Sequence, residues 1–243
     1  MVIIFEDEHL LVANKPAGWN THAPAPFAGE GLHEWLRNSG PRRAALAIIH
    51  RLDKETSGLI VFGKTSLANR SLTQQFEQRA VRKKYVLLTD RKTAFARLTA
   101  QSWLRRAGEK YLGLPAGAAG GAAVTAFRRV QPPPPMPAGR EGCFAWEAEP
   151  ATGRTHQIRV HLASRGHPLV GDPLYLRRIP APARALDDAL RRTLLDFPRQ
   201  ALHACRLGFT HPRSGATLSF CTPPPPDLQA LIERLGMAAV TET

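Results

Sequence analysis

AALAIIHRLDKETSGLIVFGK (Ala44–Lys64) decides the fold of this 243-residue chain. Two apolar, β-branched runs, Ala47–Ile49 and Leu59–Phe62, have the length and composition of buried strands. Between them lies the polar segment His50–Gly58, which ends in a glycine and therefore predicts a loop. Asp53 stands in this loop between cationic neighbours, and rigid flanking strands would hold its carboxylate in place. Asp53 is therefore the first candidate for a functional residue.

The same pattern has a simpler interpretation. An aspartate followed closely by Thr56, Ser57 and a glycine is also typical of an ordinary turn, in which the carboxylate accepts hydrogen bonds from its own backbone. Spacing alone favours that interpretation, so the choice depends on the rest of the chain.

The charge of the chain points to a polyanionic partner. Lys and Arg number 33 against 20 for Asp and Glu, which gives a net charge of +13. Nucleic acid comes before an anionic membrane because no long basic amphipathic helix stands out. A solvated basic surface without a specific ligand is the alternative.

Cysteine usage and the N-terminus indicate a cytoplasmic protein. Cys143, Cys205 and Cys221 form no CxxC pair and no zinc spacing, so a reducing compartment and no metal site are expected. The first ten residues, MVIIFEDEHL, lack the basic head and long apolar core of a signal peptide. No apolar run approaches the length that spans a bilayer.

Alternating and apolar runs predict many short strands and few helices. Strands are expected at Val2–Phe5, Leu10–Val12, Val81–Leu88, Ala96–Leu104, Ala123–Val130, Phe144–Ala148, Ala204–Thr210 and Thr217–Cys221. Helices are expected near Leu32–Leu36, at Ser66–Ala80 with Leu67, Leu72 and Phe76 facing the core, at Ala183–Leu195, and at Asp227–Leu235 with Asp227 as its cap. The Gly/Ala-rich segment 114–123 and the prolines at 132–135 and 180–182 are read as breaks.

A second informative block is GRTHQIRVHL, Gly153–Leu162. Read as a helix that ends at Gly166, it directs Ile158 and Leu162 toward the core. Thr155, Arg159 and, less closely, His156 then share the opposite side.

Together these blocks resemble the RluA-type pseudouridine synthases, which isomerise uridine to pseudouridine in structured RNA. The resemblance rests on ordered motifs over nearly the whole chain: KPAG at Lys15–Gly18, HRLDKETSG at His50–Gly58, RKKY at Arg82–Tyr85, GRTHQIRVHL with GHPLVGDPLY at Gly166–Tyr175, and LHACRLGFTHP at Leu202–Pro212. Several independent motifs in family order are far more specific than any single one. The segment 89–140 is only weakly similar.

The resemblance implies an α+β fold, a long, mainly antiparallel mixed sheet flanked by helices with a cleft across its middle. Residues 1–243 would form a single catalytic domain without a separate S4-like RNA-binding domain, and the family expectation is a monomer. The reaction needs no cofactor. The substrate would be a stem-loop of ribosomal or transfer RNA, and the sequence does not separate these two.

The resemblance also implies roles for individual residues. Asp53 would be the catalytic carboxylate, acting as a nucleophile or as a base that removes a sugar proton. Arg159 would pair with that aspartate and keep it ionised. Tyr85 would stack on the uracil and help to move a proton from C5. Arg51 would fill the gap that a flipped nucleotide leaves in the RNA stack.

Three further residues are weaker candidates for RNA contact or for support of the motifs, namely Lys15, Arg154 and His156. Lys15 could equally hold a turn in place.

Two other functions fit parts of the pattern. A non-catalytic RNA-binding or ribosome-assembly factor on the same fold would need neither Asp53 nor Tyr85 nor Arg159, so their joint presence argues against it. A glycoside or nucleoside hydrolase would prefer a second carboxylate facing the first, and Glu55 is the one obvious candidate near the motif.

Overall fold

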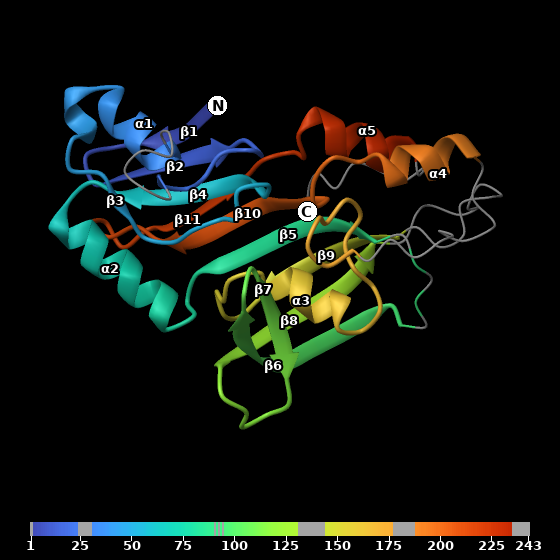
Figure 1. Ribbon diagram of the computed structural model, residues 1–243. Coiled ribbons are helices and arrows are strands. Elements are labelled where there is room, and N and C mark those ends of the chain that lie inside the picture. The colour runs from blue at the N-terminus through green and yellow to red at the C-terminus, as the bar shows by residue number, and fades with distance from the viewer. Residues whose placement is uncertain are drawn as a thin grey trace. The chain divides into compact units, whose positions relative to one another are not determined.

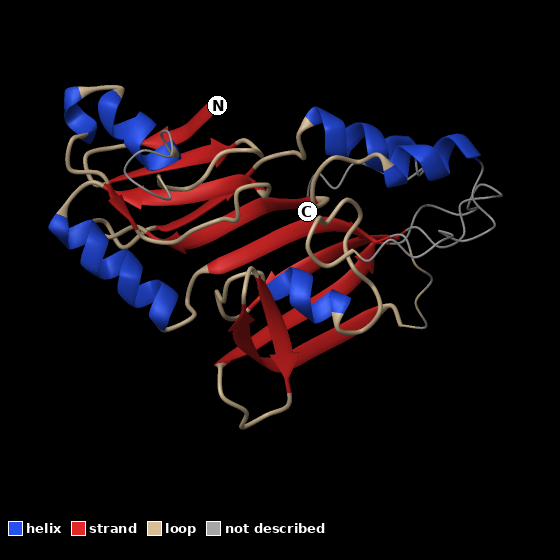
Figure 2. Ribbon diagram, viewed as in Figure 1, coloured by secondary structure: helices blue, strands red, loops and turns tan. Residues whose placement is uncertain are grey.

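The computed structural model describes residues 2–23, 31–89, 91, 93, 95–130, 144–176 and 188–234. The chain forms two compact units, Met1–Lys83 with Ala204–Thr222, and Lys84–His203 with Pro223–Thr243. Each unit consists mainly of strands with short helices packed beside them (Figures 1 and 2). The predicted single domain and central cleft stay predictions.

In the first unit, strands far apart in sequence lie side by side. Its order is β1-β2-β4-β10, with β3 paired to β4 and β11 paired to β10. The strands are β1 (Val2–Glu6), β2 (Leu10–Lys15), β3 (Ala47–Ile48), β4 (Ser57–Gly63), β10 (Leu202–Thr210, of which the first two residues belong to the second unit) and β11 (Thr217–Cys221). The β1–β2, β2–β4, β3–β4 and β10–β11 pairs are antiparallel. The strands predicted here are confirmed.

Helices α1 (Leu32–Asn38) and α2 (Ser66–Glu77) and the 3₁₀ turn η1 (Pro41–Arg43) also belong to the first unit. Helix α2 begins where the hydroxyl oxygen of Thr65 accepts a hydrogen bond from the backbone N–H of Ala68 at 3.2 Å. Ala68 and Leu72 are buried and lie four residues apart on one face. The prediction that Leu67 faces the core is wrong, because it lies off that face and is 45% exposed.

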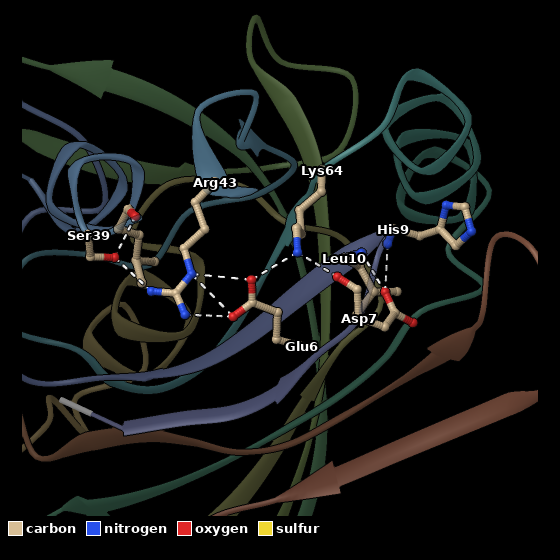
Figure 3. A network of polar contacts seen from close by, with 8 residues as sticks. Glu6, Asp7, His9, Leu10, Ser39, Arg43 and Lys64 are labelled. Carbon is tan, nitrogen blue, oxygen red and sulfur yellow. Dashed lines mark hydrogen bonds and ion pairs between the residues drawn. The ribbon is translucent and has the colours of Figure 1, made fainter. Parts of the chain in front are cut away.

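An ion network joins the turn after β1 to neighbouring segments of the first unit (Figure 3). The Glu6 carboxylate accepts hydrogen bonds from the Arg43 guanidinium at 2.6 Å and from the Lys64 ammonium at 2.8 Å. The Arg43 hydrogen bond is the main cause that lowers the pKa of Glu6. These contacts fix the end of β4 and the η1 turn against the β1–β2 turn.

The second unit contains a five-stranded antiparallel arrangement in the order β5-β9-β8-β6-β7. Its strands are β5 (Arg82–Thr89, of which the first two residues belong to the first unit), β6 (Arg97–Ala107), β7 (Lys110–Leu114), β8 (Gly121–Val130) and β9 (Phe144–Pro150). The sequence predicted four of these strands and missed β7, whose short run carries no clear alternation. The prolines at 132–135 and 180–182 lie outside the described residues.

The described residues of the second unit form three helices, and α3 (Gln157–Ala163) crosses the sheet over β8 and β9 (Figure 1). It begins later than predicted because His156 has a left-handed backbone (φ 55°), and it ends before Gly166. The others are α4 (Asp188–Leu195) and α5 (Pro226–Arg234). Asp227 lies inside the first turn of α5 and pairs with Arg199, so its predicted place as the cap is wrong.

The described helices are too short or too polar to cross a membrane.

Candidate active site

The Asp53 segment is a loop between β3 and β4 that is fixed at both sides of the aspartate. Leu52 is buried, its carbonyl accepts from the Thr21 hydroxyl at 2.9 Å, and its N–H donates to the same oxygen at 3.1 Å. The carbonyl of Asp53 accepts from the N–H of Thr56 at 3.0 Å. The Asp53 side chain is half-buried, whereas Arg51 beside it is exposed. The loop therefore presents a guanidinium and a carboxylate from a backbone that cannot easily shift.

Lys15 supports this loop from beneath. Its side chain is 0% exposed, and its ammonium donates to the carbonyls of Pro16 at 2.9 Å, Trp19 at 2.7 Å and Lys54 at 2.9 Å. The N–H of Gly18 donates to the same Lys54 carbonyl at 3.0 Å. The KPAG turn is thereby tied to the residue that follows Asp53. This geometry supports the second of the two roles predicted for Lys15, a brace within the protein.

Gly58, the second residue of β4, stands where only a glycine fits. Its φ of +118° is a conformation that other residues rarely adopt. A Cβ at this position would lie 2.3 Å from the carbonyl oxygen of Ala204 in β10. The loop therefore runs into β4 in close backbone contact with β10.

His50 opens the loop as a neutral, structural side chain. Its Nε2 accepts from the N–H of Val61 at 3.2 Å, and its ring stacks on Phe76 with centroids 4.6 Å apart. Burial lowers the pKa of His50 to about 3, with repulsion from Lys83 adding to the effect. Burial also lowers the pKa of Lys83 to about 8.

Tyr85 lies on β5 in the second unit, opposite Ala148 of β9. It is half-buried and packs against the cluster of apolar side chains that includes Trp146 and Ile158. The short RKKY motif therefore places an aromatic ring at a defined register of the sheet.

Arg159 on α3 is almost completely buried, at 3% exposed, and forms a two-bond ion pair with Asp172. Nε lies 2.7 Å from Oδ2 and Nη2 lies 2.9 Å from Oδ1. The ring of Tyr175 covers the guanidinium, with Cζ 5.1 Å from the ring centroid. Two planar groups and an aromatic face thus define where this cation lies.

Tyr175 also connects Arg159 to His156. Its hydroxyl oxygen accepts from the N–H of Tyr111 at 2.7 Å and lies 3.0 Å from Nδ1 of His156. The structure therefore brings two of the predicted residues, His156 and Arg159, into contact with one tyrosine.

Two buried polar residues bind α3 to the sheet. Gln157 donates from Nε2 to the carbonyl of Val124 and to the hydroxyl of Thr125, both at 2.9 Å. His161 lies 3.0 Å from the hydroxyls of Thr125 and Ser102 through its two ring nitrogens. Burial lowers the pKa of His161 to about 4, and Arg165 adds repulsion.

Arg154 is exposed at the start of this segment, and its Nε donates to the carbonyl of Ala122 at 3.3 Å. A Cβ on Gly121 would come within 2.8 Å of the same Nε, so the neighbouring glycine leaves room for the arginine.

The sequence profile of the family described as RNA pseudouridylate synthase matches residues 9–164. A ribosomal large subunit pseudouridine synthase D from Zymomonas mobilis is 35% identical over 96% of this chain and 72% of its own length. One from Nitrosomonas europaea is 37% identical over 96% of this chain and 64% of its own length.

The chain belongs to the RNA pseudouridylate synthase family.

Solved structures agree on the fold. Human RNA pseudouridylate synthase domain containing 4 has a TM-score of 0.74 at 22% identity and covers 96% of this chain and 92% of that one. Human RNA pseudouridylate synthase domain containing 1 has a TM-score of 0.69 at 25% identity and covers 94% and 86%. The predicted family and the predicted α+β class are confirmed.

The structure groups the family's motif residues in two places. The first unit holds Asp53, Arg51 and their brace Lys15, and the second holds Arg159 linked to His156, with Arg154 nearby in sequence and Tyr85 on β5. The predicted pairing of Asp53 with Arg159 stays a prediction. Among the described residues, His, Cys, Asp and Glu side chains form no group of three suited to a metal ion.

Sequence reasoning missed the acid that pairs with Arg159 and the tyrosine that covers it. Both Asp172 and Tyr175 stand in GHPLVGDPLY, which follows GRTHQIRVHL among the family motifs and was given no site residue. One signal was present: an arginine on a short helix with apolar neighbours needs a counter-charge if that helix is buried.

Proposed function

We propose that this chain is an RNA pseudouridine synthase that modifies large-subunit ribosomal RNA, with Asp53 as its catalytic carboxylate. Family membership supports the reaction, and the printed names of the Zymomonas and Nitrosomonas relatives support the substrate. The chain spans 64–72% of the length of those two relatives, so ribosomal RNA as the substrate is a proposal that rests on their names. The observation that carries the proposal is the braced loop that fixes Asp53 next to an exposed Arg51.

The reaction breaks the N1–C1′ bond of uridine and joins C5 to C1′, so no electrons are exchanged with a redox partner. Asp53 acts as the nucleophile or as the base in this exchange. Tyr85 stacks on the uracil, and Arg159 is the basic partner that the family resemblance assigns to the aspartate. Arg51, exposed beside Asp53, fills the stack after the nucleotide flips. Arg154 and His156 contact RNA, and the enzyme works as a monomer in the cytoplasm.

The substrate is tested with unmodified transcripts. Purified protein is incubated with transcribed large-subunit ribosomal RNA and, separately, with a pool of transcribed transfer RNAs. Pseudouridine is then mapped by carbodiimide adducts and confirmed by mass. New pseudouridine in the ribosomal transcript alone supports the proposal. Modification of transfer RNA alone would overturn the substrate, and modification of neither transcript would overturn the activity.

A further inference from the structure

Arg159 is held by a carboxylate that no motif assignment had given a role. The pair joins α3 to the segment after it, and both partners are withdrawn from water, with Arg159 3% and Asp172 1% exposed. We propose that Asp172 is a positioning residue for the isomerisation: its carboxylate fixes the direction of the Arg159 guanidinium and acts only through it. This inference rests on the proposed function.

The contact constrains both position and orientation. Nε and Nη2 of Arg159 meet Oδ2 and Oδ1 of Asp172 at 2.7 and 2.9 Å, two nearly parallel bonds between planar groups. A single hydrogen bond would leave the guanidinium free to pivot, whereas two set its plane.

The carboxylate is itself immobile. Oδ1 of Asp172 also accepts from the backbone N–H groups of Leu174 at 3.0 Å and Tyr175 at 3.1 Å. The preceding Gly171 has φ +68°, and a Cβ there would lie 2.1 Å from the carbonyl oxygen of Arg199. Asp172 therefore stands on a backbone that cannot move with the arginine, so the arginine must conform to it.

An aromatic ring limits the remaining motion. Tyr175 lies over the guanidinium at 5.1 Å, and its hydroxyl is held by the N–H of Tyr111. The cation is thus fixed at one edge by Asp172 and over one face by Tyr175.

The ion pair is one of several contacts that hold the helix in place. Gln157 and His161 bind α3 to β6 and β8 through their own hydrogen bonds. Moreover, a buried ion pair generally adds little stability over an apolar pair of similar volume. A role in aiming Arg159 explains the arrangement better than a role in stability.

The test compares Asp172→Asn with a matched control. Arg199 and Asp227 form a pair of the same geometry in the same unit, with Nε–Oδ2 at 2.8 Å and Nη2–Oδ1 at 2.9 Å, although Asp227 is more exposed. Turnover on ribosomal RNA, KM, RNA affinity by filter binding and thermal unfolding are measured for both variants. We expect Asp172→Asn to lower kcat at least about tenfold with RNA affinity within about twofold of the parent. Asp227→Asn should leave kcat unchanged.

Asp172→Glu keeps the charge but displaces the carboxylate by one carbon. Positioning predicts a clear fall in kcat for this folded variant, whereas charge neutralisation alone predicts full activity. It also replaces Asp172→Asn as the test if that variant does not fold.

A double-mutant cycle with Arg159→Lys shows whether the acid acts through the arginine. We expect the double variant with Asp172→Asn to be no slower than Arg159→Lys alone, because a lysine cannot form the two-bond pair. Losses that multiply, or an Asp172→Asn enzyme with parental kcat, would overturn the inference while the parent still makes pseudouridine. A parent that isomerises no uridine would instead overturn the proposed function, and this inference with it.

Discussion

Single side chains set the shape of the Asp53 loop, and Lys15 is the clearest case. Its ammonium is removed from water and donates to three carbonyls, one of which belongs to Lys54, the residue after Asp53. A charge in this environment is tolerated because each of its protons has an acceptor. Lys15 therefore holds the backbone of the loop in place from a buried position.

Replacing Lys15 by Met should lower the free energy of unfolding by about 2–4 kcal/mol, because three buried carbonyls lose their donor. Urea unfolding of the two proteins measures the difference. Lys54→Met is the control, since the Lys54 side chain is exposed and only its carbonyl takes part in the network. Equal stability of Lys15→Met and the parent would show that the three hydrogen bonds of Lys15 do not stabilise the protein.

The candidate residues fall into two groups: those that one short motif identifies, and those that depend on contacts between distant parts of the sequence. The loop that carries Asp53 and Arg51 could be predicted because one short motif lies between two apolar strands, whereas the roles of both residues stay predictions. Asp172 could not be predicted, because its importance lies in a contact with Arg159 that only the folded chain brings about. The two roles left open for Lys15 were separable only once its burial was known.

At the scale of elements, the Asp53 loop depends on the junction between β4 and β10. Gly58 occupies a left-handed region of φ, and any Cβ there would collide with the Ala204 carbonyl. The close approach of these two strands thus requires a glycine at the end of the motif.

Gly58→Ala should destabilise the protein by roughly 2–4 kcal/mol, since backbone strain and a steric collision add. Gly18→Ala is the matched control, because Gly18 also has a positive φ of +83° but has nothing within 4 Å of a Cβ. Backbone strain alone should lower the free energy of unfolding of Gly18→Ala by about 1 kcal/mol. Thermal or urea unfolding reports both, and equal losses would mean that the contact with Ala204 is unimportant.

Helix α3 carries a pH-dependent contribution through His161. Its folded pKa of about 4 lies below the ordinary 6.5 because burial disfavours the imidazolium. Between these two values the unfolded chain binds a proton that the folded chain does not. Stability therefore falls as the pH drops from 6.5 toward 4, and above 6.5 this residue contributes no pH dependence.

Comparison with His161→Asn isolates that contribution. Between pH 7 and pH 4.5 the free energy of unfolding of the parent should fall by about 2 kcal/mol more than that of the variant. The variant is expected to be less stable at pH 7, because an asparagine cannot replace both hydroxyl contacts. Parallel pH profiles for the two proteins would contradict the assignment.

Most strands could be predicted because their apolar runs are local signals. The exceptions have physical causes. The predicted start of α3 was too early because His156 has a left-handed backbone conformation, which the neighbouring residues in the sequence do not indicate. Leu67 was assigned to the same apolar stripe as Leu72, but the residue that shares the buried face with Leu72 is Ala68, one position further along the chain.

For the whole molecule, family membership, charge and the braced loop lead to the same claim. A net charge of +13 suits an RNA substrate, and the family match indicates an RNA pseudouridylate synthase, for which we propose Asp53 as the catalytic carboxylate. Composition and periodicity could not predict which functional residues, distant in the sequence, lie together in the folded chain. The motifs indicated this by resemblance, and for Asp53 and Arg159 it stays a prediction.

The most direct test of the central claim is pseudouridine formation by Asp53→Asn on ribosomal RNA, measured beside RNA affinity. Glu55→Gln is the control, since it removes a neighbouring carboxylate of the same loop. We expect Asp53→Asn to bind RNA within about threefold of the parent but to form no pseudouridine, because the reacting carboxylate is lost. Glu55→Gln should keep its turnover. An Asp53→Asn protein that still converts uridine would contradict the account.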